Sequence, residues 1–191
     1  MTEPMTEPMT GPITASITKA AHVSAIYISP VATQLPEAVD QVRAIAGAGL
    51  EGDRYCAESS ADADVDGDGD SSDGASGRGT WSRWPGGGRQ VTLIEAEVLA
   101  ELEATLGVTG AETRRNIVTS GVKLNDLVGV DFTVGEVMMR GVRLCEPCAH
   151  IEKLTVRGVA LALDNCGGLR ADILQGGIVF KGDKLERILD R

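Results

Sequence analysis

The chain has 191 residues, of which 42% are hydrophobic and only 3% aromatic, so we expect one domain with a core of aliphatic side chains. The formal net charge is −10, which argues against a nucleic-acid partner because phosphate contacts need clustered Lys and Arg. No apolar run is long enough to span a bilayer, the N-terminus lacks secretory-signal features, and the four cysteines lack the spacing of a disulfide framework. We therefore expect a cytoplasmic protein with no membrane partner.

The first half of the sequence predicts two strands between two irregular segments. Residues 1–21 begin with the near-repeat MTEPMTEPMTGP, whose low complexity and prolines predict a disordered tail. Aliphatic, β-branched runs predict strands at 23–29 and near 38–45. Asp, Ser and Gly dominate 57–88, which we interpret as an acidic, disordered insertion. Within it, the aspartates over 62–73 have the spacing of an EF-hand calcium loop, but the final Glu and the flanking helices are missing, so biased composition is the preferred explanation.

The second half predicts mostly short strands. Residues 90–94 form the first of these, and apolar residues at 98, 99, 102 and 106 predict an amphipathic helix over 95–106 that stops at Gly107. We expect further strands at 115–119, 131–134, 136–144, 169–174 and 177–188, with a short helix at 159–163. The predicted fold is thus mostly β with a few short helices, closed or nearly closed into a β-barrel, in a single domain over 22–191 interrupted by the insertion.

The densest group of reactive side chains is Cys145-Glu146-Pro147-Cys148, followed by His150. A reactive Cys148 thiolate with a neighbouring helper is the first interpretation, because only the thiolate is a nucleophile or a soft metal ligand. Three alternatives stay open at this point: a dithiol redox pair, a structural zinc site that needs ligands from elsewhere in the chain, and two buried thiols without chemistry.

Several arginines near Gly or Asn are candidates for anion binding. They are Arg54 after a Gly-Asp pair, Arg114 and Arg115 before Asn116, and Arg170, which lies two residues after the pair Gly167-Gly168. The guanidinium fork fits phosphate geometry, although a single Arg more often forms a salt bridge with a local acid. Together with a thiol, these residues would form a cleft for a phosphate-bearing, sulfur-rich ligand.

Six motifs in one order then resemble a known family. They are GLEGDR at 49–54, RQVTLIEAE at 89–97, RRNIVTSGVKLNDLVG at 114–129, DFTVGEV at 131–137, LCEPC at 144–148 and GLRADILQGGIVFKGD at 168–183. Each is weak alone, but their order over about residues 23–188 resembles the MOSC family, named for the C-terminal domain of molybdenum cofactor sulfurase.

The resemblance implies a barrel-like domain that binds molybdenum cofactor (molybdopterin) or carries sulfur as a cysteine persulfide. The family's reactive cysteine falls on Cys148, which would ligate molybdenum or accept sulfur, whereas Cys145 occurs only in some relatives. The expected catalytic residues are Cys148, Cys145 and His150, with Glu146 or His150 assisting proton transfer. The expected cofactor-binding residues are Arg54, Arg115, Asn116 and Arg170, and Asp53 is expected to orient Arg54.

The same resemblance implies a dependence on a partner. A cysteine desulfurase or another sulfur donor would supply sulfur, because this chain has no room for the pyridoxal-phosphate domain of full-length sulfurases. If the protein is an enzyme, we expect a sulfurtransferase-like or molybdenum-cofactor-dependent activity through Cys148. The alternatives are a non-catalytic anion-binding module with structural thiols or zinc, and a dithiol oxidoreductase.

Overall fold

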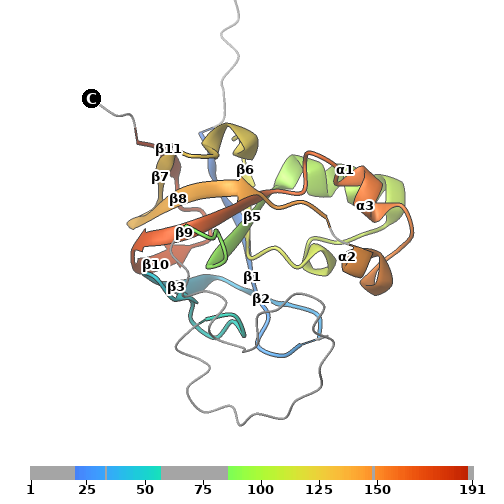
Figure 1. Cartoon of the computed structure of the whole chain (residues 1–191), viewed down its shortest axis with the longest axis horizontal. Helices are drawn as coiled ribbons and strands as arrows, with labels where there is room; N and C mark the ends of the chain where they lie inside the picture. Colours follow the sequence, from blue (N-terminus) through green and yellow to red (C-terminus); the bar gives the residue numbers. More distant parts are fainter. Residues whose placement is uncertain (1–19, 33, 57–85, 148, 189–191) are drawn as a thin grey trace, which may run out of the picture.

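The computed structural model describes residues 20–32, 34–56, 86–147 and 149–188 (Figure 1). Most of the predicted tail, nearly all of the predicted insertion with its EF-hand-like spacing, and Cys148 lie outside these ranges. The described part is mostly β with a few short helices, as the sequence predicts.

Two sheets build the fold. In the long strand β8 (Val137–Leu144), Val137, Met139 and Gly141 are buried and Arg140 is exposed, so alternate residues of this strand face the core. The larger sheet has the order β11 (Leu185–Arg187), β7 (Asp131–Val134), β8 (Val137–Leu144), β9 (Leu169–Gln175), β5 (Val91–Glu95), β6 (Ile117–Ser120), β1 (His22–Ile28) and β2 (Glu37–Val39). The smaller sheet has the order β10 (Gly177–Phe180), β3 (Gln41–Ile45) and β4 (Gly49–Leu50).

One aliphatic cluster joins the two sheets into a single core. Its members include Ile26 and Leu93 from the larger sheet and Leu50 and Val179 from the smaller one, all at most 1% exposed. Phe132 is the one aromatic side chain among the buried members of this cluster. The scarcity of aromatic residues in the sequence is therefore reflected in the core, which depends on close packing of branched side chains.

The helices gather at one end of the larger sheet (Figure 1). Helix α1 (Ala96–Leu106) connects β5 to β6, which pair in parallel, and it ends at Gly107 in the left-handed conformation with φ of 68°, as predicted. It packs with α2 (Ala149–Leu154) and α3 (Val159–Ala162) in a second apolar cluster. Two 3₁₀ turns, η2 (Ala111–Thr113) and η3 (Leu124–Leu127), complete the described helical segments.

The structure refines the predicted strand boundaries. The strand predicted near 38–45 is split at Asp40 into β2 and β3, which belong to different sheets. The segment predicted at 177–188 divides into β10 and β11 at a turn that contains Gly182 with φ of 97°. Among the described strands, β2 and β11 remain the edges of the larger sheet, so closure into a barrel stays a prediction. No described helix is long and apolar enough to cross a membrane.

The edge strand β10 has two carboxylates along its outer side. Its backbone pairs with β3 on one side, with Ile178 opposite Arg43 and Phe180 opposite Gln41. The N–H of Ile178 donates to Glu136 Oε1 at 2.9 Å, and the N–H of Phe180 donates to Asp183 Oδ2 at 2.8 Å. The backbone donors that point away from β3 at these two residues are therefore satisfied by side chains.

Candidate functional site

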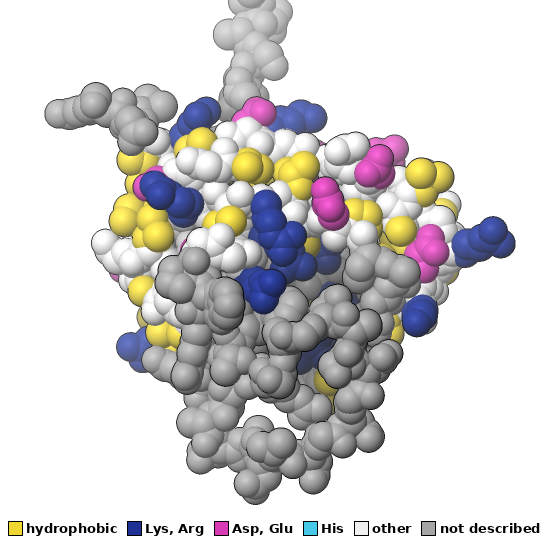
Figure 2. Space-filling model, viewed as in Figure 1, with side chains coloured by type: hydrophobic (Ala, Val, Ile, Leu, Met, Phe, Trp, Pro, Cys, Tyr) yellow, Lys and Arg dark blue, Asp and Glu magenta, His cyan; other side chains and the backbone are white. Residues whose placement is uncertain are grey.

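A basic cavity of about 390 Å³ lies between the larger sheet and the helical end. Figure 2 shows basic side chains gathered near the centre of this face. Five arginines line the cavity, whereas Asp53 is the one acidic residue among the described lining residues. The lining residues that carry the argument below are Arg54, Arg89, Arg114, Arg115, Arg170, Tyr27, Ser29, Asp53, Tyr55, Thr92, Asn116 and Cys145.

Asp53 fixes the loop that follows β4. Its Oδ2 accepts hydrogen bonds from the backbone N–H of Ser29 at 3.1 Å and from Asn116 Nδ2 at 3.0 Å. Its Oδ1 accepts one from the backbone N–H of Tyr55 at 3.0 Å. Asp53 thus holds the backbone on either side of Arg54, and both of its oxygens are engaged within the protein.

Asn116 joins three segments through its side-chain amide. Oδ1 accepts hydrogen bonds from the backbone N–H of Thr92 at 3.2 Å and from its hydroxyl at 2.8 Å. Nδ2 donates to the Tyr27 carbonyl at 3.3 Å and to Asp53 Oδ2 at 3.0 Å. An amide has two donor hydrogens and two acceptor lone pairs, so these four bonds use its full capacity. Asn116 lines the cavity, and its side-chain amide is fully engaged with the protein there; its role in binding a cofactor stays a prediction.

The Arg115 guanidinium also donates most of its hydrogen bonds to groups of the protein. Its Nε donates to the Gly167 carbonyl at 2.9 Å, one terminal nitrogen to Thr113 O at 3.0 Å, and the other to Cys145 O at 3.2 Å. These bonds tie η2 to the end of β8 and the start of β9. Arg115 therefore positions the segment that leads to Cys148, in addition to lining the cavity.

Arg54 and Arg170 differ from Arg115 because each has a buried Nε without a hydrogen-bond partner among the described residues. The Arg54 guanidinium stacks over the Tyr55 ring, with 4.4 Å between Cζ and the ring centroid, and one terminal nitrogen donates to the Tyr55 hydroxyl. An unpaired buried donor is costly, and more so on a charged group. Both arginines thus have donor capacity that an anion in the cavity would satisfy.

Arg114 reaches the other side of the same loop. Its two terminal nitrogens donate to the Gln34 carbonyl at 2.9 Å and to the Ser29 hydroxyl at 3.0 Å. Burial lowers the pKa of Arg114, and the charge of Arg54 lowers it further, against opposing contributions from Tyr55 and Asp53. Its backbone lies in the left-handed region with φ of 59°, which is uncommon for a residue other than Gly.

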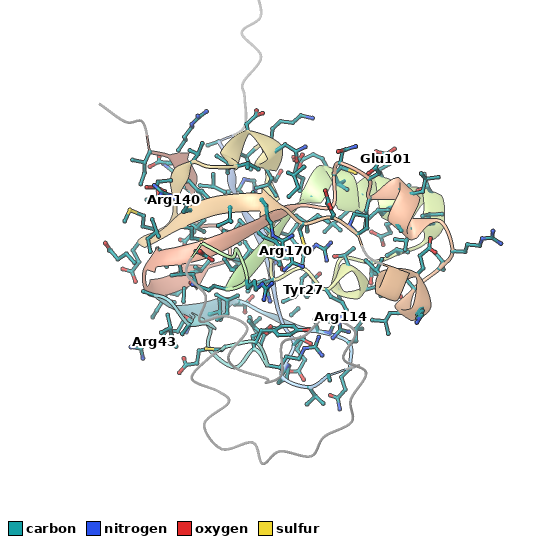
Figure 3. The ribbon with its side chains drawn as sticks, viewed as in Figure 1. Tyr27, Arg43, Glu101, Arg114, Arg140 and Arg170 are labelled. Atoms are coloured by element: carbon teal, nitrogen blue, oxygen red, sulfur yellow. The ribbon has the colours of Figure 1, made fainter. Side chains whose placement is uncertain are left out.

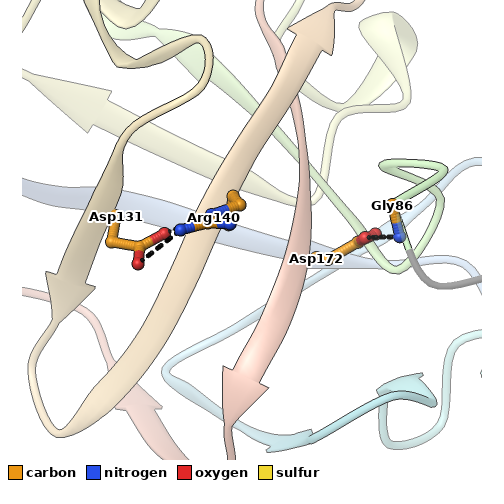
Figure 4. Close-up of polar contacts among 4 residues, drawn as sticks. All are labelled: Gly86, Asp131, Arg140 and Asp172. Atoms are coloured by element: carbon orange, nitrogen blue, oxygen red, sulfur yellow. Dashed lines mark hydrogen bonds and ion pairs between the residues drawn. The ribbon is translucent and has the colours of Figure 1, made fainter.

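Arg89 lines the cavity although the sequence did not single it out. Its segment is anchored by the buried Asp172 of β9, which accepts a hydrogen bond from the backbone N–H of Gly86 at 2.6 Å (Figure 4). Asp172 also accepts one from the backbone N–H of Gly88 at 2.9 Å. A side chain at Gly88 would meet Arg170 Cβ at 3.0 Å, so the backbone there passes close to Arg170. The signal available in the sequence was the position of Arg89 at the start of the RQVTLIEAE motif.

The described cysteines occupy three different environments. Cys145 is 1% exposed and lines the cavity, where its backbone N–H donates to the Gly168 carbonyl at 2.7 Å. Cys56 is buried beside Ala48. Cys166 is partly buried, and burial raises the pKa of its thiol, as do nearby acidic residues. Cys145 is therefore the one described cysteine in the cavity wall.

The remaining predicted residues lie at the edge of what the structure describes. Cys148 falls outside the described residues, and α2 begins directly after it at Ala149. His150 belongs to α2 by its backbone. Among the described residues, no group of three or more His, Cys, Asp or Glu side chains has the arrangement of a metal site.

Comparisons with known proteins agree with this architecture. The structure is similar to the YUAD protein from Bacillus subtilis, with a TM-score of 0.67 and 17% identity over 90% of this chain and 98% of that one. It is also similar to YiiM from Geobacillus stearothermophilus (TM-score 0.59, 12% identity, 88% and 75% coverage) and YiiM from Escherichia coli (0.57, 16%, 88% and 70%). No curated protein matches the chain in sequence. A sequence model of the MOSC domain matches residues 72–186, which is more than half of the chain, and the chain therefore belongs to the MOSC domain family.

Proposed function

We infer that this MOSC domain binds a molybdenum–pterin cofactor in the arginine-lined cavity, with the Cys148 thiolate as the ligand of molybdenum. The observation that carries this inference is the pair of buried, unpartnered Nε atoms of Arg54 and Arg170 in a cavity whose wall also includes Cys145. A phosphate group accepts hydrogen bonds from guanidinium groups, and a soft thiolate suits molybdenum. The side chains present thus match the chemistry of such a cofactor.

The residues have distinct roles in this proposal. Arg170 would bind the phosphate, and Arg54 is a second arginine of the cavity with an available donor. Arg115 and Asn116 would act indirectly: Arg115 holds the carbonyl of Cys145, and Asn116 holds the loop that carries Arg54. When bound, the cofactor would supply the oxygen-atom and electron transfer chemistry of molybdenum.

A second candidate is sulfur transport at the same cysteine. In this reaction the Cys148 thiolate attacks the terminal sulfur of a donor persulfide, such as that of a cysteine desulfurase. The donor S–S bond breaks, a new S–S bond forms on Cys148, and the donor leaves as a thiolate. The position of Cys145 favours this candidate, because its buried sulfur lies in the cavity wall three residues before Cys148. His150 or Glu146 would exchange the proton at the thiol.

A non-catalytic anion-binding module is the third candidate, with the thiols in structural roles. The arginine cavity alone is sufficient for it, and the four engaged bonds of Asn116 are as expected for a rigid binding site. It differs from the first two in needing no chemistry at Cys148.

Elemental analysis and intact mass of protein from a molybdenum-replete host distinguish the candidates. We expect molybdenum and pterin near one per chain, lost in Cys148→Ala and retained in Cys166→Ala, whose sulfur lies outside the cavity lining. A mass increase of one sulfur atom, also lost in Cys148→Ala, would favour sulfur transport instead. Zinc, or identical results for Cys148→Ala and the unmodified chain, would refute a role of Cys148 in either chemistry.

A further inference from the structure

Two arginines lie directly opposite each other across β8 and β9. Arg143 and Arg170 are Cα partners in this antiparallel pair, so their side chains leave the same face of the sheet. Like charges in this position destabilise a sheet unless a counter-charge lies between them. Among the described residues, neither side chain has a hydrogen bond or an ion pair, and Nε of Arg170 is buried. This pair, called the sheet pair below, therefore lacks a described counter-charge.

A second basic pair, the loop pair, consists of Arg54 and Arg114. Nε of Arg54 is buried without a described partner, and the charge of Arg54 lowers the pKa of Arg114 after the larger effect of burial. The neighbouring carboxylate of Asp53 accepts three hydrogen bonds from other groups. The loop pair thus also has more positive charge than its described surroundings balance.

Arg170 of the sheet pair and both residues of the loop pair line the cavity, and they come from different elements. Arg170 pairs with Thr92 across β9 and β5, and Thr92 in turn bonds Asn116, two residues after Arg114. Two strand spacings, about 10 Å, therefore separate the backbone of Arg170 from that of Asn116. Figure 3 shows Arg170 and Arg114 at different places with Tyr27 between them. Arg54 is among the charged groups that shift the pKa of Arg114 and Arg170 is not, so the charge of Arg170 acts on Arg114 less than that of Arg54 does. Each pair also has its own buried Nε that needs an acceptor.

We propose that the cavity binds two anionic groups at once, one at Arg170 of the sheet pair and one at the loop pair. A cofactor with a single phosphate occupies one of them. The other then binds the acidic group of a substrate, such as a carboxylate or phosphate; this assignment of the two occupants rests on the proposed function, whereas the presence of two anion subsites does not.

The surroundings of the loop pair indicate which subsite holds the substrate. Arg114 bonds Ser29 and Gln34, and the loop between and beside them carries the exposed Val31 (47%) and Leu35 (60%). Tyr55, also exposed at 47%, stacks on Arg54. An organic acid with an apolar body would place its anionic group on the loop pair and its body along these apolar side chains.

Titration of nitrogen-15-labelled protein with inorganic phosphate tests the two subsites through the arginine Nε–H signals. We expect the signals of Arg143 and Arg170 to follow one binding curve and those of Arg54 and Arg114 another. Replacing Arg170 with Gln should weaken the first curve by about tenfold and leave the second in place, and Arg54→Gln should do the reverse. The matched control is Arg140→Gln, because Arg140 lies on β8 and pairs with Asp131 at 2.6 Å outside the cavity lining (Figure 4).

Three outcomes would overturn the two subsites: one shared curve for all four arginines, equal weakening of both curves by either variant, or no response to phosphate. The amide spectrum of each variant shows whether it remains folded, and Arg170→Lys, which keeps the charge, repeats the test if Arg170→Gln does not fold. Two curves in a protein that never acquires molybdenum or sulfur would support the two subsites and refute the proposed function. A single curve in a protein that does acquire molybdenum would do the opposite.

Discussion

Replacing Asn116 with Ala tests the inference that this residue is a structural link rather than a ligand-binding group. The substitution removes four hydrogen bonds and leaves the Tyr27 carbonyl, the Thr92 N–H and one contact of Asp53 without their partner. Each bond contributes about 0.5–1.5 kcal/mol net, and partial exposure lets water replace some of them, so we expect a loss of about 3 kcal/mol in the free energy of unfolding. At about 2–4 °C per kcal/mol, Tm should fall by about 6–12 °C.

Urea unfolding followed by far-ultraviolet circular dichroism measures this loss, with Asn125→Ala as the control. Asn125 makes one exposed hydrogen bond, from Nδ2 to the Asn165 carbonyl at 2.9 Å, and its removal should cost less than about 1 kcal/mol. If the two variants lost the same stability, the link through Asn116 would contribute nothing beyond an ordinary surface contact. Conversely, the folded Asn116→Ala protein should still bind phosphate through its arginines.

The other predictions concern close packing, thiol reactivity and acid stability. Gly168→Ala should lower the free energy of unfolding by more than about 3 kcal/mol, because the new Cβ would lie 1.9 Å from Leu93 O at a φ of 103°. Gly107→Ala is the control: its φ is 68° but the space around it is open, so the loss should be about 1 kcal/mol. Equal Tm values for the two variants would contradict this. Alkylation of Cys166, followed by peptide mass spectrometry, should need a higher pH than a free cysteine does, since burial and nearby acids raise its pKa; labelling at the rate of a free thiol would argue against that environment. Burial raises the pKa of Glu97, but hydrogen bonds from Gly121 and Ser120 give a net lowering. The contribution of Glu97 to the free energy of unfolding is therefore present above its unfolded pKa and is lost as pH falls through its folded pKa. Glu97→Gln should make the fall in stability at acid pH less steep, and an unchanged fall would refute this.

Much of the fold follows from the sequence because its strands are aliphatic runs with a regular alternation. The helix over 95–106 was predicted within one residue of α1, and Gly107 ends it as expected, since both signals are local. The division of 38–45 between two sheets was not predictable, because Asp40 interrupts pairing only through the positions of distant partner strands. Local patterns specify elements, but sheet membership depends on long-range contacts.

The candidate site shows the same limit more clearly. In the sequence, Arg115 and Arg170 are equally plausible candidates, because each lies near Gly or Asn. In the structure, Arg115 donates to a carbonyl 52 residues away, whereas Nε of Arg170 is buried without a described partner. Which arginine retains donors for a ligand therefore depends on the fold and is not visible in the local sequence.

The carboxylates along β10 have a consequence for self-association. A free strand edge is a template onto which a second chain can add its own strand, and Ile178 and Phe180 would make such a contact adhesive because both are exposed. Glu136 and Asp183 occupy the two amide donors that an incoming strand would need. Any added strand would first have to displace the two carboxylates from these N–H groups. Their negative charge would then lie beside the carbonyl groups of the added strand, which is unfavourable. Glu136 and Asp183, which lie outside the cavity lining, thus disfavour self-association of the chain by strand addition at β10.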